Sequence, residues 1–466
     1  MAITRRQFVT RLGALAAAAG FSQVQASKIM DAVAYDPATA PGSVYQGNFG
    51  KPRVVWLHGA ECTGCSTSLL GVYERFGGTA VEGLPYTVVD ALGLAGTFPI
   101  NNPFLVNSAV PTLTATSLTP DPGAVDIADV VIDVIDLLYH ETIQGMGGDL
   151  AYQWLNDFAT TNNKPFVLVV EGALQKTSNG GAWGDVSTTV PWCSIARNDA
   201  GTAEIVTSEI VKTLGETANC VAIIAIGQCA TFGGYPACKP PISNAVAGFD
   251  ATHSQTDALG TFDFLTSQSS TAAAKVVNVP GCPTNPWWFI LSVVAFMVDA
   301  NAVLQGHAAP LGILGPGTVH APDVTPFVVD IVGGVDGSRR LKAVYSNAVH
   351  SGYCSKYRYY AQGIFAQHPG DHGCLQKIGC KGPAARSLCS THGWNNQQPQ
   401  NIGLATPSTQ ATLDANGNHV AVTTANPAAT AGYPYEGGNC TRAGHPCMAC
   451  TEQGYPDAFV PFVVRS

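Results

Sequence analysis

Two cysteines separated by two residues, Cys62 and Cys65, stand in the string WLHGAECTGCS, directly after the short apolar run Arg53–Leu57. Thiolates at this spacing on a loop can bind the same metal centre. Most of the other cysteines also occur in short loops that contain glycine or proline, among them GQC at Cys229, PGCP at Cys282, HSGYC at Cys354, GCL at Cys374, GCKGP at Cys380, NC at Cys440 and HPCMAC at Cys447 and Cys450. This pattern predicts a chain that holds several metal clusters.

The elements that position these loops alternate along residues 51–305. The predicted strands are Val54–Leu57, Tyr86–Asp90, Asp129–Ile135, Phe166–Val170, Val221–Ile226 and Lys275–Val279. The predicted helices are Ser66–Phe76, Gly148–Thr160, Thr202–Thr217 and Pro286–Leu304. Continuous apolar strands separated by helices are typical of a parallel sheet covered on both faces. The chain is therefore predicted to begin with an α/β domain at residues 51–305.

Four cysteines follow strands of this predicted sheet. Cys62 and Cys65 follow the first strand, and Cys229 and Cys282 follow the last two. Open parallel sheets bind their ligands at the carboxyl ends of the strands. We therefore expect these four thiols to converge at one edge of the sheet.

The remainder, residues 306–466, loses this alternation and is rich in glycine, proline and cysteine. We predict a loop-rich domain whose cofactors supply much of its order. Two stretches without cysteine, Gly93–Gly123 and Gln397–Gly438, are predicted to be insertions or surface loops.

The first 26 residues have the form of an export signal. Arg5 and Arg6 form a twin-arginine pattern, an apolar run from Leu12 to Phe21 follows, and small residues up to Ala26 mark a cleavage site. This route exports folded proteins, which predicts a periplasmic protein whose cofactors are inserted first. The longest later apolar run, Trp287–Val298, is too short to cross a bilayer, so we expect a soluble or peripheral protein with no transmembrane span.

Composition narrows the classes of ligand. A net charge of -9 without a basic stripe argues against a nucleic-acid partner. Fourteen cysteines in an exported chain are also compatible with disulfides, and a C-x2-C pair is compatible with zinc. The first pair, however, has no second pair within 120 residues, whereas zinc sites usually have two pairs close in sequence. Iron–sulfur clusters are the favoured interpretation, and a zinc- or disulfide-stabilised binding protein remains an alternative.

Seven motifs in order resemble those of the small subunit of [NiFe] hydrogenases. They are GAECTGCS, YHETI at Tyr139–Ile143, VEGAL at Val170–Leu174, GQCATFGG at Gly227–Gly234, VPGCPTNP at Val279–Pro286, GCKGP at Gly379–Pro383 and GHPCMAC at Gly444–Cys450. The resemblance implies a flavodoxin-like parallel-sheet domain followed by a loop-rich iron–sulfur domain. It also implies three clusters in a row and a separate large subunit that holds the catalytic nickel and iron.

The resemblance implies which residues bind the two outer clusters. A proximal [4Fe–4S] cluster would be bound by Cys62, Cys65, Cys229 and Cys282. A distal [4Fe–4S] cluster would be bound by His350, Cys354, Cys374 and Cys380. The family places its histidine three residues before the cysteine, whereas His350 precedes Cys354 by four; both spacings share a face of a helix. His368 and His372 lie near Cys374 and are alternatives.

The medial cluster would be bound by Cys389, Cys447 and Cys450. Many relatives carry a [3Fe–4S] cluster here, with proline in place of a fourth ligand, and Cys440 occupies that place in this chain. We therefore predict a medial [4Fe–4S] cluster that includes Cys440, or a [3Fe–4S] cluster if Cys440 is not a ligand. Three cysteines remain. Cys220 is predicted to lie in the core, and Cys193 and Cys238 are either unused or paired after export.

The predicted function is electron transfer in an H2:acceptor oxidoreductase, as the subunit of a heterodimer without the catalytic metals. The expected acceptor is a c-type cytochrome or a membrane cytochrome b. The alternative is an iron–sulfur subunit of another respiratory complex with the same proximal site. Such subunits generally lack the motifs GCKGP and GHPCMAC.

Overall fold

The computed structural model describes two main regions of the chain, together with short stretches between them. The described residues are 52–70, 73–75, 86–89, 95–98, 124–126, 135–175, 191–197, 204–238, 258–293 except 287 and 291, 335–389 except 347, 351–353, 355 and 372, then 394 and 439–464 except 442. The predicted export signal and the predicted surface loop Gln397–Gly438 lie outside these residues.

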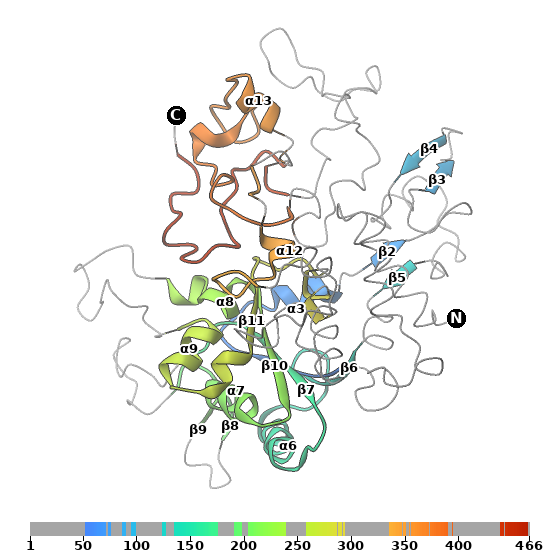
Figure 1. Ribbon diagram of the computed structural model, residues 1–466, viewed down its shortest axis with the longest axis vertical. Coiled ribbons are helices and arrows are strands. Elements are labelled where there is room, and N and C mark those ends of the chain that lie inside the picture. Colours follow the sequence, from blue (N-terminus) through green and yellow to red (C-terminus); the bar gives the residue numbers. More distant parts are fainter. Residues whose placement is uncertain are drawn as a thin grey trace, which may run out of the picture.

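The first region is built on a five-stranded sheet in which every neighbouring pair is parallel (Figure 1). Its strands, in chain order, are β1 (Arg53–His58), β6 (Asp136–His140), β7 (Phe166–Glu171), β10 (Cys220–Ile226) and β11 (Val276–Val279). The spatial order is β11-β10-β7-β1-β6. The chain thus starts inside the sheet, adds one strand on one side and then three on the other. This is the flavodoxin-like order, and it confirms the predicted fold class.

Both faces of the sheet are covered, which explains why its strands are apolar throughout. One face packs against α6 (Gly148–Thr161), α7 (Thr207–Glu216) and α9 (Thr261–Ser267), through alternate residues such as Leu57, Val170 and Ile223. The opposite face carries Trp56, whose ring centroid lies 5.3 Å from that of Phe289. The described residues from 288 to 293 are helical, in the predicted helix Pro286–Leu304.

Three sequence predictions need correction. The predicted helix Ser66–Phe76 is α3 (Gly64–Leu70), and β2 (Tyr73–Arg75) follows it, paired with β5 (Ala124–Asp126). The predicted helix Thr202–Thr217 starts later, because β9 (Glu204–Val206) first pairs with β8 (Ser194–Arg197). Tyr86–Asp90 is not in the main sheet: β3 (Tyr86–Val89) pairs with β4 (Ala95–Phe98), which lies inside the predicted insertion Gly93–Gly123.

The strand predicted at Asp129–Ile135 lies, except for Ile135, outside the described residues. The strand β6 begins directly after it.

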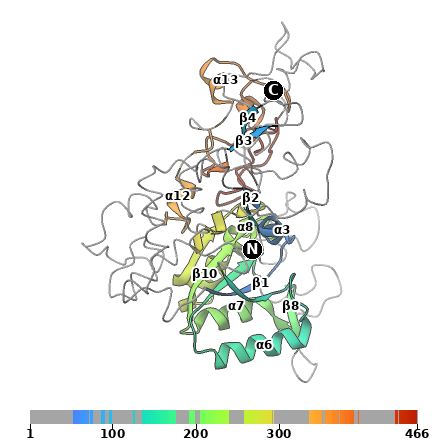
Figure 2. The ribbon, with the colours of Figure 1, turned by 90° about the vertical axis from the view of Figure 1, so that its right-hand side faces the viewer.

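The second region contains little regular structure, as predicted. Its described elements are α12 (Lys342–Tyr345), α13 (Tyr357–Ala361) and the 3-10 helix η5 (Leu375–Ile378). Two small apolar clusters, one around Val349 and Ala449 and one around Ala366 and Ile378, form its interior. In both views most of this region lies at one end of the sheet, on the far side of α8 (Gly227–Phe232), and α12 is its part nearest to the sheet (Figure 2). Among the described residues, no helix is long and apolar enough to span a bilayer.

Candidate metal centres

Four cysteines predicted to form the proximal set lie together where β1, β10 and β11 end. Cys65 is in α3, Cys229 is in α8, and Cys62 and Cys282 are in the adjoining loops. Burial raises the pKa of Cys65, Cys229 and Cys282, and neighbouring thiols of the same set raise it further. The pKa reaches about 12 at Cys229 and about 11 at Cys282. The structure therefore brings these four residues together, in surroundings that favour the thiolate form only when a cation neutralises it.

Glycine allows the backbone to approach this set closely. Gly227 has a φ of +84°, and a Cβ added there would lie 2.4 Å from the sulfur of Cys65. Gly234 has a φ of +52°, and its added Cβ would lie 2.9 Å from the sulfur of Cys229. Any side chain at these positions would occupy space beside the thiols.

A buried carboxylate, Glu171, fixes the start of α3. It ends β7, and its oxygens accept hydrogen bonds from the backbone N–H groups of Cys65 (2.9 Å) and Ser66 (3.1 Å) and from the indole of Trp56 (3.2 Å). Burial raises the pKa of Glu171, while hydrogen bonds from Ser66 lower it. Sequence reasoning placed Glu171 in the VEGAL motif but assigned it no role. The signal in the sequence was that this charged residue ends a continuous apolar strand, where a carboxylate is expected to be buried and to need hydrogen-bond partners.

Glu61, next to Cys62, is a paired carboxylate. Its Oε1 lies 3.0 Å from Nδ1 of His58 and accepts a hydrogen bond of 3.1 Å from the hydroxyl of Thr63. The ring of His58 lies 5.0 Å from that of His140. Burial lowers the pKa of His140 to about 4, so this imidazole is neutral near pH 7.

The four residues predicted for the medial set line one cavity. It encloses about 480 Å³ of space not filled by atoms, part of it open to solvent. Its lining includes Cys389, Cys440, Cys447 and Cys450, together with Trp288 and Trp394. Burial raises the pKa of all four thiols. Cys440 therefore lies beside the three cysteines with which the sequence grouped it.

The four residues predicted for the distal set line a second cavity, which encloses about 300 Å³ of space not filled by atoms, part of it open to solvent. They are His350, Cys354, Cys374 and Cys380. Nε2 of His350 is buried and has no hydrogen-bond partner, and burial lowers the pKa of this imidazole. A neutral ring with a nitrogen that makes no hydrogen bond, at a cavity also lined by thiols, is the form in which histidine binds a metal. The donors present thus suit an iron–sulfur cluster with one histidine ligand.

The alternatives at the distal set are placed differently. His368 is largely exposed, and its Nδ1 lies 3.1 Å from the carboxylate of Asp371; His372 lies outside the described residues. His350 and Cys354 themselves lie in bends, and residues 351–353 between them lie outside the described residues. Both His350 and Cys354 line the same cavity.

Neighbouring residues connect each set of thiols to the next. Gly281 and Pro283, on either side of Cys282 in the proximal set, line the cavity of the medial set, and Cys282 lies close enough to Cys450 to influence the pKa of its thiol. The backbone N–H of Cys447 donates to the sulfur of Cys380 in the distal set, at 3.2 Å. The three sets therefore form a continuous row. Among the described residues, no three His, Cys, Asp or Glu side chains lie close enough together to bind one metal ion.

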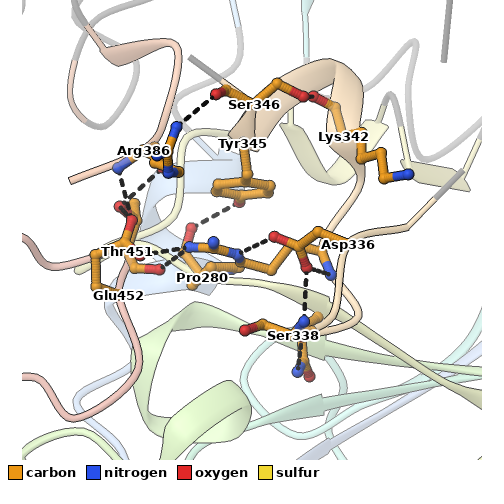
Figure 3. Close-up of polar contacts among 11 residues, drawn as sticks. Pro280, Asp336, Ser338, Lys342, Tyr345, Ser346, Arg386, Thr451 and Glu452 are labelled. Carbon is orange, nitrogen blue, oxygen red and sulfur yellow. Dashed lines mark hydrogen bonds and ion pairs between the residues drawn. The ribbon is translucent and has the colours of Figure 1, made fainter. Parts of the chain in front are cut away.

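A buried arginine, Arg340, joins the loops of the proximal and medial sets (Figure 3). Only 5% of it is exposed, and its guanidinium bonds to the carboxylates of Asp336 (2.9 Å) and Glu452 (3.0 Å). It also donates to the carbonyl of Thr451, next to Cys450, at 2.9 Å. The guanidinium stacks on the ring of Tyr345, 5.4 Å from its centroid, and the Tyr345 hydroxyl donates to the carbonyl of Pro280, two residues before Cys282.

The other three cysteines are unbridged and lie away from the cavities. Cys220 is buried in β10, as predicted. Cys193 donates to the hydroxyl of Thr207, and Cys238 donates to the carbonyl of Gly234. The two loop cysteines are therefore not paired with each other in this structure.

Comparisons with known proteins agree with this geometry. Residues 122–296 match the family "NADH ubiquinone oxidoreductase, 20 Kd subunit", and residues 345–411 match the family that describes the C-terminal part of the NiFe/NiFeSe hydrogenase small subunit. The second match covers part of both cavities, including Cys354, Cys374, Cys380 and Cys389. The chain is similar to [NiFe] hydrogenase small subunits in its C-terminal part and to the NADH ubiquinone oxidoreductase subunit in its sheet region. This similarity implies that the chain holds iron–sulfur clusters.

Hydrogenase small subunits align along most of the chain. The periplasmic [NiFe] hydrogenase small subunit of Solidesulfovibrio fructosivorans is 25% identical over 465 residues, which cover 99% of this chain and 92% of the relative. The periplasmic [NiFeSe] hydrogenase small subunit of Desulfomicrobium baculatum is 24% identical and covers 85% of this chain, at 90% of its own length. The [NiFeSe] hydrogenase structure from Desulfovibrio vulgaris Hildenborough shares the fold, with a TM-score of 0.53, 22% identity and coverage of 91% of this chain and 100% of the other.

Proposed function

We propose that this chain is the electron-transfer small subunit of an exported [NiFe] hydrogenase heterodimer, which catalyses the reversible conversion of H2 to two protons and two electrons. The observation that supports this proposal is the row of three donor sets, in which residues beside Cys282 line the medial cavity and Cys447 bonds to the sulfur of Cys380. When bound, iron–sulfur clusters supply one-electron carriers. The large subunit, with nickel and iron, would be the partner at the proximal end.

We assign three [4Fe–4S] clusters to the three donor sets. The proximal ligands are Cys62, Cys65, Cys229 and Cys282, the medial ligands are Cys389, Cys440, Cys447 and Cys450, and the distal ligands are His350, Cys354, Cys374 and Cys380. The two cavities support the medial and distal assignments. The protein controls each cluster through its ligands, its burial and hydrogen bonds to sulfur.

The twin-arginine pattern at Arg5 and Arg6 supports export to the periplasm. Two of the relatives above are named periplasmic hydrogenase small subunits, which agrees with this proposal. The predicted cleavage after Ala26 is tested by sequencing the N-terminus of the mature protein.

The alternative function, an iron–sulfur subunit of another respiratory complex, is favoured by the match of residues 122–296 to a subunit of NADH:ubiquinone oxidoreductase. That match covers Cys229 and Cys282 but ends before the medial and distal sets. The C-terminal match to hydrogenases distinguishes the two functions and favours the hydrogenase.

Co-purification with a tagged copy of this chain tests the function. We expect brown protein with a roughly equimolar nickel-containing partner, and hydrogen-dependent reduction of a viologen dye. A colourless product rich in zinc would contradict the iron–sulfur assignment. A brown product with a nickel-free partner and no hydrogen-dependent activity would favour the alternative respiratory subunit.

Replacing His350 with alanine is expected to remove the distal cluster and lower the iron content by about four atoms per chain. The reason is that Nε2 of His350 is the one nitrogen donor placed at the distal cavity. Iron analysis and EPR of the reduced protein measure the loss. The matched control, His368→Ala, changes an exposed histidine and should leave the iron content unchanged. His350→Cys should retain the cluster at a lower potential. Unchanged spectra in His350→Ala would exclude this residue as a ligand.

A further inference from the structure

A buried serine, Ser387, contacts a thiol of the medial set. Only 3% of Ser387 is exposed, and it lines the medial cavity. Its hydroxyl donates a hydrogen bond of 3.1 Å to the sulfur of Cys389. Burial raises the pKa of the Cys389 thiol to about 12, and the bond from Ser387 opposes this effect. Ser387 lies in none of the seven motifs that the chain shares with hydrogenase small subunits.

The direction of this hydrogen bond follows from the other contact of the hydroxyl. A serine hydroxyl has one proton to donate and two lone pairs that accept. The backbone N–H of Cys389 donates to the Ser387 oxygen, at 3.4 Å, which leaves the hydroxyl proton for the sulfur. A thiolate bound to iron has no proton and only accepts. The hydroxyl therefore stays the donor when a cluster is bound, and the negative charge on sulfur strengthens the bond.

The backbone on the N-terminal side of Ser387 is held from two directions (Figure 3). The N–H of Arg386 donates to the carboxylate of Glu452, at 2.6 Å, and the carbonyl of Arg386 accepts from the hydroxyl of Thr451, at 3.1 Å. Thr451 directly follows Cys450, a second thiol of the medial set. These bonds tie the loop of Ser387 to the loop of Cys450 and so hold the serine hydroxyl at the medial cavity.

The surroundings of the bond increase its effect. The described residues that line the medial cavity include Trp288, Val349 and Ala385 and no charged side chain. A hydrogen bond in such surroundings is screened less than in water, and no ion on the cavity wall competes with it. The distal cavity differs, because the buried Lys356 is among its lining residues. At the medial cavity, neutral groups such as the Ser387 hydroxyl supply the electrostatic control.

We propose that Ser387 sets the reduction potential of the medial cluster through its hydrogen bond to Cys389. This inference rests on the proposed function, because it requires a cluster at the medial cavity. Reduction moves one electron from a neighbouring cluster of the row, which is oxidised, to the medial cluster. The added electron makes the ligand sulfurs more negative, and a hydrogen-bond donor stabilises the more negative state more strongly. The bond therefore raises the potential, whether the cluster contains four irons or three.

A purely structural role in the turn is the alternative. Serine oxygens often accept a hydrogen bond from the backbone N–H two residues further on and so stabilise a turn. Here the Ser387 oxygen lies 3.1 Å from the sulfur of Cys389 but 3.4 Å from its backbone nitrogen, although sulfur is the larger atom. The geometry thus favours the sulfur as the main partner of the hydroxyl.

The test is a redox titration of the purified heterodimer followed by EPR, with iron analysis of each sample. Cys389→Ala identifies the signal of the medial cluster, because it removes one of the proposed ligands. Ser387→Ala removes the hydroxyl, and Ser387→Thr keeps it. The matched control is Ser292→Ala. Ser292 is also buried, but its hydroxyl donates to the carbonyl of Trp288, at 2.8 Å, beside the same cavity.

Ser387→Ala should lower the equilibrium constant for reduction of the medial cluster about fivefold, which corresponds to a fall in potential of about 40 mV for one electron. Ser387→Thr and Ser292→Ala should each change this constant less than twofold, and all three variants should retain their iron. An unchanged constant in Ser387→Ala, or an equal fall in either of the other two variants, would overturn the proposal. Loss of medial iron in Ser387→Ala would also overturn it, because Ser387 would then serve assembly of the site.

The inference and the proposed function can fail separately. A heterodimer that shows the expected shift but no hydrogen-dependent reduction of viologen would refute the hydrogenase function alone. An active heterodimer whose medial potential does not respond to Ser387→Ala would overturn the role of Ser387 alone.

Discussion

Replacing Arg340 with methionine is expected to destabilise the protein by about 3–5 kcal/mol, because the change leaves two partly buried carboxylates without their buried cation. Asp336 and Glu452 both bond to this guanidinium, and Glu452 also bonds to the backbone of Arg386. Burial disfavours the charged form of Arg340, but the two carboxylates overcome this effect and raise its pKa. The measurement is thermal unfolding, whose midpoint should fall by roughly 5–10 °C.

The control for Arg340 is Arg197→Met. Arg197 also bonds to a carboxylate, that of Glu204 at 3.1 Å, but its side chain is 66% exposed. Solvent screens such a pair, so no measurable change is expected. Equal unfolding midpoints for the two variants would show that the Arg340 network adds nothing to stability. Because Arg340 joins the loops of Cys282 and Cys450, its variant should also lose visible iron–sulfur absorbance before it unfolds, which Arg197→Met should not do.

The convergence of the proximal cysteines was predictable from the sequence. Apolar strands without alternation indicate a parallel sheet, and ligands of such sheets bind at the carboxyl ends of the strands. β1, β10 and β11 have the expected positions, so Cys62, Cys229 and Cys282 meet where the pattern placed them. The order of the strands in the sheet could not be predicted in this way, because an apolar run does not indicate which other strand it pairs with.

Other features could not be predicted because they depend on contacts between distant segments. Glu171 bonds to Cys65 across 106 residues, and Arg340 bonds to Glu452 across 112. Neither pair leaves a local pattern in the sequence. The end of α3 at Leu70 was also missed, because Tyr73–Arg75 pairs with Ala124–Asp126 and this distant pairing overrides local helix propensity. The partners of Glu171 and Arg340 and the end of α3 therefore depend on contacts between segments that are distant in the sequence.

The His350 spacing shows a different limit. A helix would place His350 and Cys354 on one face, but both residues lie in bends. Their place at the distal cavity is accompanied by long-range backbone bonds, from Val349 to Ala385 and from His350 to Gly382. The spacing of the two residues alone does not predict such bonds.

Replacing Cys440 with alanine is expected to convert the medial cluster from [4Fe–4S] to [3Fe–4S]. Cys440 lines the same cavity as Cys389, Cys447 and Cys450, and its thiol is close enough to those of Cys389 and Cys450 to raise their pKa values in addition to the effect of burial. Without this thiolate one iron loses its protein ligand, so the iron content should fall by about one atom per chain. An oxidised [3Fe–4S] EPR signal should appear, at a potential higher by on the order of 100 mV.

The matched control for Cys440 is Cys220→Ala, which removes a more deeply buried thiol at the start of β10, the end of that strand opposite to Cys229. It should cost some stability through the small cavity that it leaves, but it should not change the iron content or the EPR spectrum. If Cys440→Ala also leaves both unchanged, Cys440 is not a ligand. A full [3Fe–4S] signal in the oxidised, undamaged wild-type protein would lead to the same conclusion. Loss of the whole medial cluster in Cys440→Ala would instead mean that the three remaining thiolates cannot hold it, which the family's three-cysteine [3Fe–4S] sites argue against.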